Sequence, residues 1–364
     1  MASLSRLAAG SIAALLAIIP LAASTSRVTH GRTSVASSGA VGRPLLEPVM
    51  PGTDDVRRRL AEKAQGTYIG EMLAERDSAL ARWPDRAGDP LVVWVQPDAD
   101  IPGWNASYVD EVRDAFLDWN AVRLPVRFSF TDDSAAADVH VRFVDHFDEE
   151  ISGRTRWARD DHWWITDADI SLAVYHRDGP ILDDDAMHAM SLHEIGHLLG
   201  LGHSMLGETE LIAGGRRVLG AESVMFPIAF SAGALNRVLR ADDIAGISDI
   251  YGNQQFRNST GSMSGRVTKN GAGVVGAHVI AFHPATGKLV ATFTLAGDGT
   301  FVIAGLDPGP QIVRAEPLDD AEASSFLDAS FSVDTNFKVA FYNKLVTVPR
   351  GGTAGNVDLK VVPK

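Results

Sequence analysis

Between residues 90 and 252, short apolar alternations are interrupted by segments with helical periodicity. Alternation predicts half-buried strands, and a recurrence every three to four residues predicts helices with one apolar face. Ser107 is placed to cap one helix, and a last helix is expected over about residues 242–251. The expected strands are residues 91–95, 126–130, 139–143 and 170–174. This order of strands and helices predicts an α+β domain over residues 90–252.

The pattern changes at residue 262. Short alternations, such as Phe301 with Ile303, are separated by turns rich in Gly, Pro and Asp. The pair Asp298-Gly299 is a strong hairpin signal, and no long helical period follows. We therefore expect residues 262–364 to form a second, all-β sandwich domain, joined to the first by a polar linker at 253–261.

The first 26 residues have the features of a secretory signal peptide. Arg6 gives a positive start, residues 7–21 are apolar but short for a membrane span, and Ala22-Ala23-Ser24 offers small residues for cleavage. A retained membrane anchor is the alternative. Residues 27–89 are expected to be a linker or pro-segment. The chain is thus expected to be secreted, extracellular or periplasmic, without stable membrane insertion after cleavage.

Charge and cysteine content narrow the chemistry. The 364 residues carry a net charge of −13 at pH 7, which argues against nucleic acid as a partner. The chain has no cysteine, so it has no disulfide and no thiolate. A zinc ion would need nitrogen and oxygen ligands.

The most informative segment is His193-Glu194-Ile195-Gly196-His197-Leu198-Leu199-Gly200-Leu201-Gly202-His203. Positions four apart share one helix face, so His193 and His197 are expected to aim at one point. Gly200 is suited to end the helix and let His203 return as a third ligand. Three protein ligands with a fourth position left open are typical of one catalytic zinc.

Glu194 lies beside that point and is expected to act as a general base. Zinc lowers the pKa of a water to about 7. Glu194 would take a proton from this water and pass it to a leaving amine, which predicts amide hydrolysis in protein or peptide substrates. The alternative is a secreted binding or adhesion protein with a catalytically silent zinc site, although such a site has no need of Glu194.

The motif and a downstream methionine turn, Val224-Met225-Phe226-Pro227, resemble the metzincin metalloproteases. The pair His203-Ser204 and the segment 242–252 resemble the matrixin subfamily, matrix-metalloprotease-like enzymes, and the resemblance covers about residues 91–252. It implies a metzincin fold with Met225 as an apolar floor. It also implies zinc ligands at His193, His197 and His203, and a base at Glu194.

The resemblance also implies a substrate cleft. The strand that contains Ile170 and Leu172 would edge it and pair with extended substrate, and Pro227 would wall a side-chain pocket. Two features depart from many matrixins: the pro-segment has no cysteine, and the segment between His203 and Met225 is long.

Other features are open to two interpretations. The run Asp183-Asp184-Asp185 fits a calcium site or a capped, solvated helix start. The C-terminal residues 262–364 loosely resemble carboxypeptidase-regulatory-like, transthyretin-like β domains, which implies an accessory or substrate-docking module. Nothing in the sequence indicates the oligomeric state.

Overall fold

The computed structural model describes residues 82–84, 86, 88–148, 151–160, 164–175, 181–212, 215–226, 238–251, 254–294, 296–318 and 332–364. The expected signal peptide, most of the expected linker or pro-segment, and Pro227 lie outside these residues. Within the described ranges, no helix is long and apolar enough to cross a bilayer.

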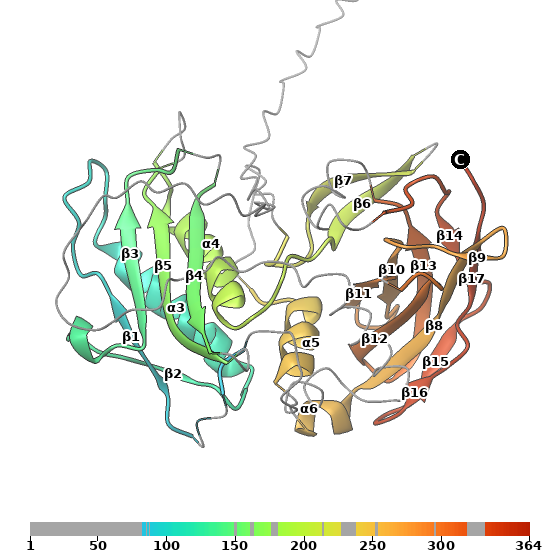
Figure 1. The fold of residues 1–364 in the computed structure, drawn as a ribbon, viewed down its shortest axis with the longest axis horizontal. Helices are drawn as coiled ribbons and strands as arrows, with labels where there is room; N and C mark the ends of the chain where they lie inside the picture. The colour runs from blue at the N-terminus through green and yellow to red at the C-terminus, as the bar shows by residue number, and fades with distance from the viewer. Residues whose placement is uncertain are drawn as a thin grey trace, which may run out of the picture.

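A five-stranded sheet and two helices form the first half of the described chain (Figure 1). Across the sheet, the strands are β2 (Phe128–Phe130), β1 (Leu91–Val95), β3 (Val139–Val144), β5 (Ile165–Ala173) and β4 (Gly153–Arg159). All neighbours are parallel except β4, which runs antiparallel to β5. Helices α3 (Ser107–Ala121) and α4 (Asp184–Leu198) pack against each other and on this sheet. The mixed α/β content agrees with the expected class.

The position of β5 corrects one expectation. This strand lies between β3 and β4, so it is not an edge of the sheet. Ile170 and Leu172 are both buried in the hydrophobic core. Alternation reveals that a strand has a buried face, but it does not reveal which strand ends the sheet. The edge strand nearest the histidine helix is instead β4, which packs against α4.

The helix starts differ in part from expectation. Asp183 is the N-cap of α4, and its carboxylate accepts a hydrogen bond from the Ala186 N–H at 2.8 Å. Ser107, however, is the first residue of α3 and not its cap. Its hydroxyl donates instead to Asp184 Oδ1 at 2.7 Å and so ties α3 to the start of α4.

A β-hairpin occupies the long segment after the histidine motif, where no strand was expected. Strands β6 (Gly207–Ile212) and β7 (Gly215–Ala221) pair antiparallel. In Figure 1 the hairpin extends from the histidine helix toward the C-terminal strands.

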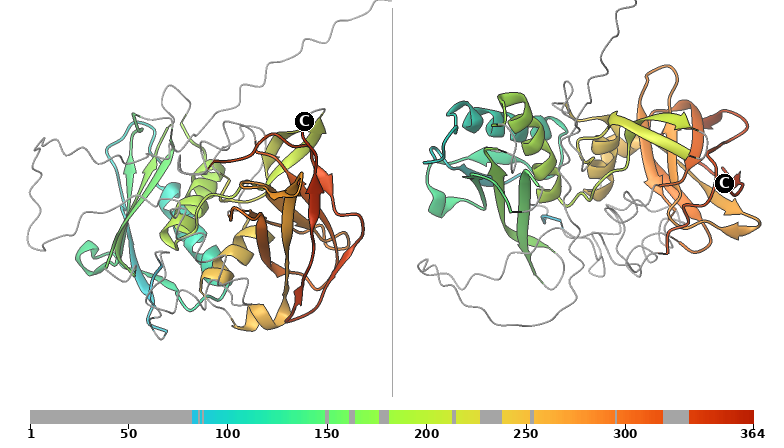
Figure 2. Two further views of the ribbon diagram at one scale, coloured as in Figure 1. Left: turned by 45° about the vertical axis from the view of Figure 1, so that its right-hand side comes forward. Right: turned by 90° about the horizontal axis from the view of Figure 1, so that it is seen from above.

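Two further sheets and a second hydrophobic cluster form the C-terminal half (Figure 2). One sheet holds β11 (Leu289–Phe293), β10 (His278–Phe282), β13 (Gly309–Glu316) and β14 (Ala340–Phe341), with β15 (Val346–Val348) also paired to β13. The other holds β12 (Thr300–Leu306), β8 (Gly261–Lys269) and β16 (Thr353–Ala354), with β9 (Ala272–Gly273) and β17 (Leu359–Val361) also paired to β8. The described residues from Gly261 onward contain no helix.

Helices α5 (Ala241–Ile250) and α6 (Gln254–Ser259) connect the two halves. The expected polar linker therefore contains a helix, and Phe256 of α6 packs against the second hydrophobic cluster. Ala245 of α5 belongs to that same cluster, whereas Ile247 and Ile250 belong to the first.

Candidate metal and active site

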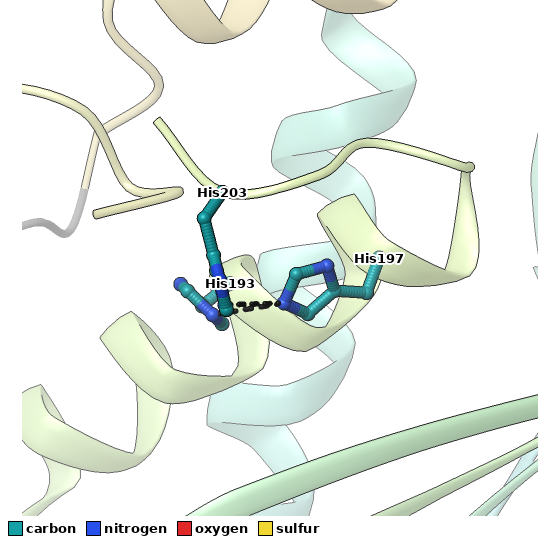
Figure 3. A group of neighbouring side chains, drawn as sticks. All are labelled: His193, His197 and His203. Carbon is teal, nitrogen blue, oxygen red and sulfur yellow. Dashed lines mark hydrogen bonds between the residues drawn. The ribbon is translucent and has the colours of Figure 1, made fainter. Parts of the chain in front are cut away.

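The structure brings the three motif histidines together. His193 and His197 project from the last turns of α4, and His203 comes from the segment that follows it (Figure 3). Gly200 ends the helix with a φ of 98°, a left-handed conformation that glycine adopts without strain. His197 Nε2 lies 3.1 Å from His193 Nε2 and 3.2 Å from His203 Nε2. Among the described residues, these side chains are the group placed to hold a metal ion.

Backbone carbonyls orient two of the rings. His193 Nδ1 lies 2.7 Å from the Val224 carbonyl, and His197 Nδ1 lies 2.8 Å from the Leu201 carbonyl. A carbonyl only accepts hydrogen bonds, so each Nδ1 carries the proton and each Nε2 presents a lone pair. Two lone pairs facing each other at 3.1 Å repel, and a shared cation removes that repulsion. This second layer of carbonyl contacts is typical of metal-binding histidines.

Burial keeps these histidines in the neutral form that binds metals. Burial is the main cause that lowers the pKa of His193 to about 4 and of His197 to about 3, and repulsion from His193 adds to the effect on His197. The pKa of His203 is also well below its usual value, first through burial and then through the other two rings. The residues present therefore fit a zinc ion held by three neutral imidazoles.

Glu194 lies beside the triad, and its carboxylate is not part of the metal-ligating group. Only 2% of the residue is exposed. The Thr155 hydroxyl lies 2.6 Å from Glu194 Oε2 and 2.9 Å from the Glu194 carbonyl oxygen. At Gly153, an added methyl group would lie 2.5 Å from Glu194 Oε1. Gly153 and Thr155 of β4 thus form a cradle for this carboxylate.

Sequence reasoning missed the cradle. Neither Gly153 nor Thr155 lies near the motif in the sequence, and a polar segment between two charged loops gives no sign that it contacts a helix. The alternation of Gly153 and Thr155 on one strand face becomes informative only once β4 is known to cover α4.

Met225 lies directly under the histidine helix. It is buried, and its sulfur lies so close to Gly196 that a methyl group there would overlap it. The Met225 carbonyl accepts a hydrogen bond from the Ser204 N–H at 2.9 Å, next to His203. Met225 thus contacts the histidine helix at Gly196 and the segment that carries His203 at Ser204.

Asp243 of α5 holds the turn that carries Met225. Its carboxylate accepts hydrogen bonds from the Ser223 hydroxyl at 2.5 Å, the Val224 N–H at 3.2 Å and the Arg240 N–H at 2.8 Å. Burial raises the pKa of Asp243, although these hydrogen bonds oppose the shift. This contact was missed because Ser223 and Val224 lie about 20 positions earlier in the chain.

Comparisons with known proteins found similarity to metalloendoproteinases in the part of the chain that contains the three histidines. The family model Matrixin matches residues 145–252. Metalloendoproteinase 5-MMP of Arabidopsis thaliana is 28% identical over 213 residues, which cover 53% of this chain and 51% of that protein. Metalloendoproteinase 1-MMP of the same plant is 29% identical over 175 residues, covering 44% and 42%. The chain thus spans about half the length of the curated relatives it matches.

Among solved structures, myroilysin is 15% identical, with 47% of this chain and 82% of that chain covered. The TM-score is 0.29, an overlap too low to define a common fold. The Matrixin match thus runs from Asp145 through the histidine triad and α5, so it includes the three rings that lie together in the structure.

Proposed function

We propose that this chain is a secreted zinc-dependent endopeptidase. The observation that carries the proposal is the convergence of three imidazole Nε2 atoms beside a buried glutamate that is not itself a ligand. A structural zinc site uses four protein ligands, whereas three ligands leave a position for a reacting molecule. The match to metalloendoproteinases supports peptide bonds as the substrate class.

His193, His197 and His203 would hold one zinc ion, with Met225 as the floor. When bound there, zinc lowers the pKa of water and polarises a carbonyl oxygen. Glu194 is the proposed general base, because its buried carboxylate follows His193 directly in the sequence and is not one of the metal-ligating groups. It takes the proton of the attacking water and returns it to the leaving amine.

The edge strand β4 is the proposed docking strand for extended substrate, in place of the strand that contains Ile170 and Leu172. An edge strand presents unpaired backbone N–H and C=O groups, which pair with an extended peptide. β4 also carries the cradle of Glu194, so a peptide paired to it would pass next to the base. Pro227 stays a proposed wall of the side-chain pocket.

The remaining parts of the proposal concern the whole chain. We assign residues 1–26 to a signal peptide, 27–89 to a linker or pro-segment, and 90–252 to the catalytic domain. We assign 262–364 to an accessory β sandwich of the carboxypeptidase-regulatory-like kind, supported by the two sheets of strands β8–β17. We assign no calcium to Asp183 and Asp184, because one caps α4 and the other binds Ser107.

The test is cleavage of casein by the purified chain, with zinc content measured in parallel. We expect cleavage to stop with a chelator and to return with zinc. Glu194→Gln should retain about one zinc per chain yet lose activity by a factor of ~10²–10⁴, the usual contribution of a general base. Glu222→Gln, the same chemical change outside the site, is the matched control.

His203→Ala should lose both zinc and activity. Zinc loss in Glu194→Gln would instead make Glu194 a ligand and overturn its assignment as the base. A wild-type chain that binds one zinc and cuts no peptide would favour the binding protein with a silent site.

A further inference from the structure

Helix α5 belongs to both halves of the described chain. Its residues Ile247 and Ile250 lie in the hydrophobic cluster of the first half, and Ala245 lies in the cluster of the second. Ala245 meets β12 at Gly305, where an added methyl group would lie 2.5 Å from the Ala245 Cβ. The C-terminal strands therefore pack directly on this helix.

Asp242 lies in the first turn of α5, and each of its two carboxylate oxygens accepts a hydrogen bond from a different half of the chain. Oδ2 accepts a hydrogen bond from the Ser204 hydroxyl at 2.6 Å, and Oδ1 accepts one from the Ala291 N–H at 2.9 Å. Ala291 lies in β11, an edge strand, and its N–H points away from the neighbouring strand β10. The carboxylate thus binds the open edge of the C-terminal sheet on one side and the histidine segment on the other.

Ser204, which binds Asp242, is the residue next to the proposed metal ligand His203. Ser204 directly follows His203 and donates its own N–H to the Met225 carbonyl at 2.9 Å. Its hydroxyl oxygen also accepts a hydrogen bond from the Leu206 N–H at 3.2 Å. A shift of the Ser204 hydroxyl would therefore move the backbone that carries His203.

We propose that the C-terminal strands brace the metal site, and that Asp242 is the positioning residue that connects Ala291 of β11 to Ser204 beside His203. The inference rests on the metal centre of the proposed function. It gives the C-terminal half a role in fixing the third metal ligand, independent of any role in substrate docking. Outer contacts of this kind change metal affinity by ~10–100-fold in other sites.

The experiment measures zinc affinity of the full chain by competition with a chromogenic chelator. Ala291→Pro removes the N–H that Asp242 binds, at an edge position where proline is tolerated. We expect about tenfold weaker zinc binding, as for Ser204→Ala. Leu289→Pro is the matched control, because the N–H two residues away on the same edge also points away from β10. Its zinc affinity should stay close to that of the wild type, with thermal unfolding confirming that both proline variants are folded.

A double variant tests whether the link runs through Asp242. In an Asp242→Ala background, Ala291→Pro should have no further effect on zinc affinity. Asp242→Ala also leaves β11 intact, so it serves as the second variant if Ala291→Pro does not fold. Unchanged zinc affinity in Asp242→Ala or in folded Ala291→Pro would overturn the brace. A wild-type chain that binds zinc and cuts no peptide would overturn the proposed function and leave the brace standing.

Discussion

Glu194 depends on a neighbouring strand for its orientation. Its carboxylate is almost fully buried and contacts two residues of β4 that lie on one strand face, Gly153 and Thr155. A base must lie within hydrogen-bond reach of the proton it removes, so its orientation matters as much as its presence. Gly153 supplies the space and Thr155 supplies the donor.

Replacing Thr155 by valine removes the hydroxyl and keeps the shape of the side chain. We expect the kcat for a fluorogenic peptide to fall about tenfold or more, since a hydrogen bond to a charged group contributes ~1.5–3 kcal/mol. KM should change little, because the hydroxyl faces Glu194. Thr155→Ser should recover most of the rate. Equal impairment in the serine and valine variants would show that packing, and not the hydroxyl, is what matters.

Gly196 is the second residue with a specific steric requirement. Gly196→Ala should lower the free energy of unfolding by ~1–3 kcal/mol, because the new methyl group overlaps the Met225 sulfur. The loss should shrink in a Met225→Ala background. Gly246→Ala in α5 is the control, since its methyl group would meet only the end of the Leu201 side chain at 3.1 Å. Urea denaturation measures the free energy of unfolding of Gly196→Ala, Met225→Ala, their double variant and Gly246→Ala. Equal losses in Gly196→Ala and Gly246→Ala would contradict the steric explanation.

At the residue scale, the sequence was informative where the chain itself fixes the geometry. The turn of a helix places His193 and His197 together, and Gly200 lets His203 follow. The residues that support the site come from distant segments: Thr155 contacts Glu194, Asp242 contacts Ser204, and Asp243 holds the turn that carries Met225. No local pattern determines such contacts, and the error at Ile170 and Leu172 has the same origin, since sheet order is a tertiary property.

At the scale of elements, α5 carries two adjacent carboxylates, of which Asp243 is buried and Asp242 is partly buried. Burial, followed by repulsion from Asp243, raises the pKa of Asp242 to about 7. In the unfolded chain this pKa returns to its ordinary value of 3.8. The folded protein thus retains a proton between these values that the unfolded chain has released.

This shift predicts that stability falls as the pH rises. Between about pH 4 and pH 7 the folded state binds more protons than the unfolded state, so the free energy of unfolding decreases with pH, by up to ~1.4 kcal/mol per pH unit for one group. Asp242→Asn has no such proton to retain and should lose less stability over the same range. Urea denaturation of the metal-free protein at pH 4.5 and pH 7 measures the difference. Parallel losses in the two proteins would contradict the shifted pKa.

Most elements could be placed from periodicity. β1 was expected over residues 91–95, and α5 was placed within one residue of each end. The hairpin β6–β7 was missed because its strands are glycine-rich and charged and lack the apolar alternation that marks a buried face. β4 was missed for a similar reason, since its apolar side chains, Trp157 and Ala158, are adjacent and do not alternate with polar ones.

At the scale of the whole molecule, the change of pattern expected at residue 262 lies close to the end of the described helices, which stop before Gly261. The segment expected to be a polar linker, residues 253–261, contains helix α6. The polar composition of residues 253–261 gives no sign that the Phe256 side chain packs against the second hydrophobic cluster. Ala245, earlier in α5, belongs to the same cluster, and the sequence did not indicate this contact either.

Since α5 contributes to both hydrophobic clusters, the two halves should unfold together. All seven tryptophans lie between residues 83 and 164, so tryptophan fluorescence reports on the first half alone. Hydrogen exchange at amides of strands β8–β17 reports on the second. In a urea series we expect both signals to give one midpoint. Two separate midpoints would mean that the shared helix does not couple the clusters.

The shared helix also limits how such a chain can be divided. A protein trimmed after residue 252 would retain α5 but expose the Ala245 face to water and deprive Asp242 of its Ala291 partner. Such a fragment should be prone to self-association through that newly bared face. In the history of the lineage, exchange of the C-terminal half for an unrelated module would then require compensating changes along α5, so the halves should be inherited as a pair.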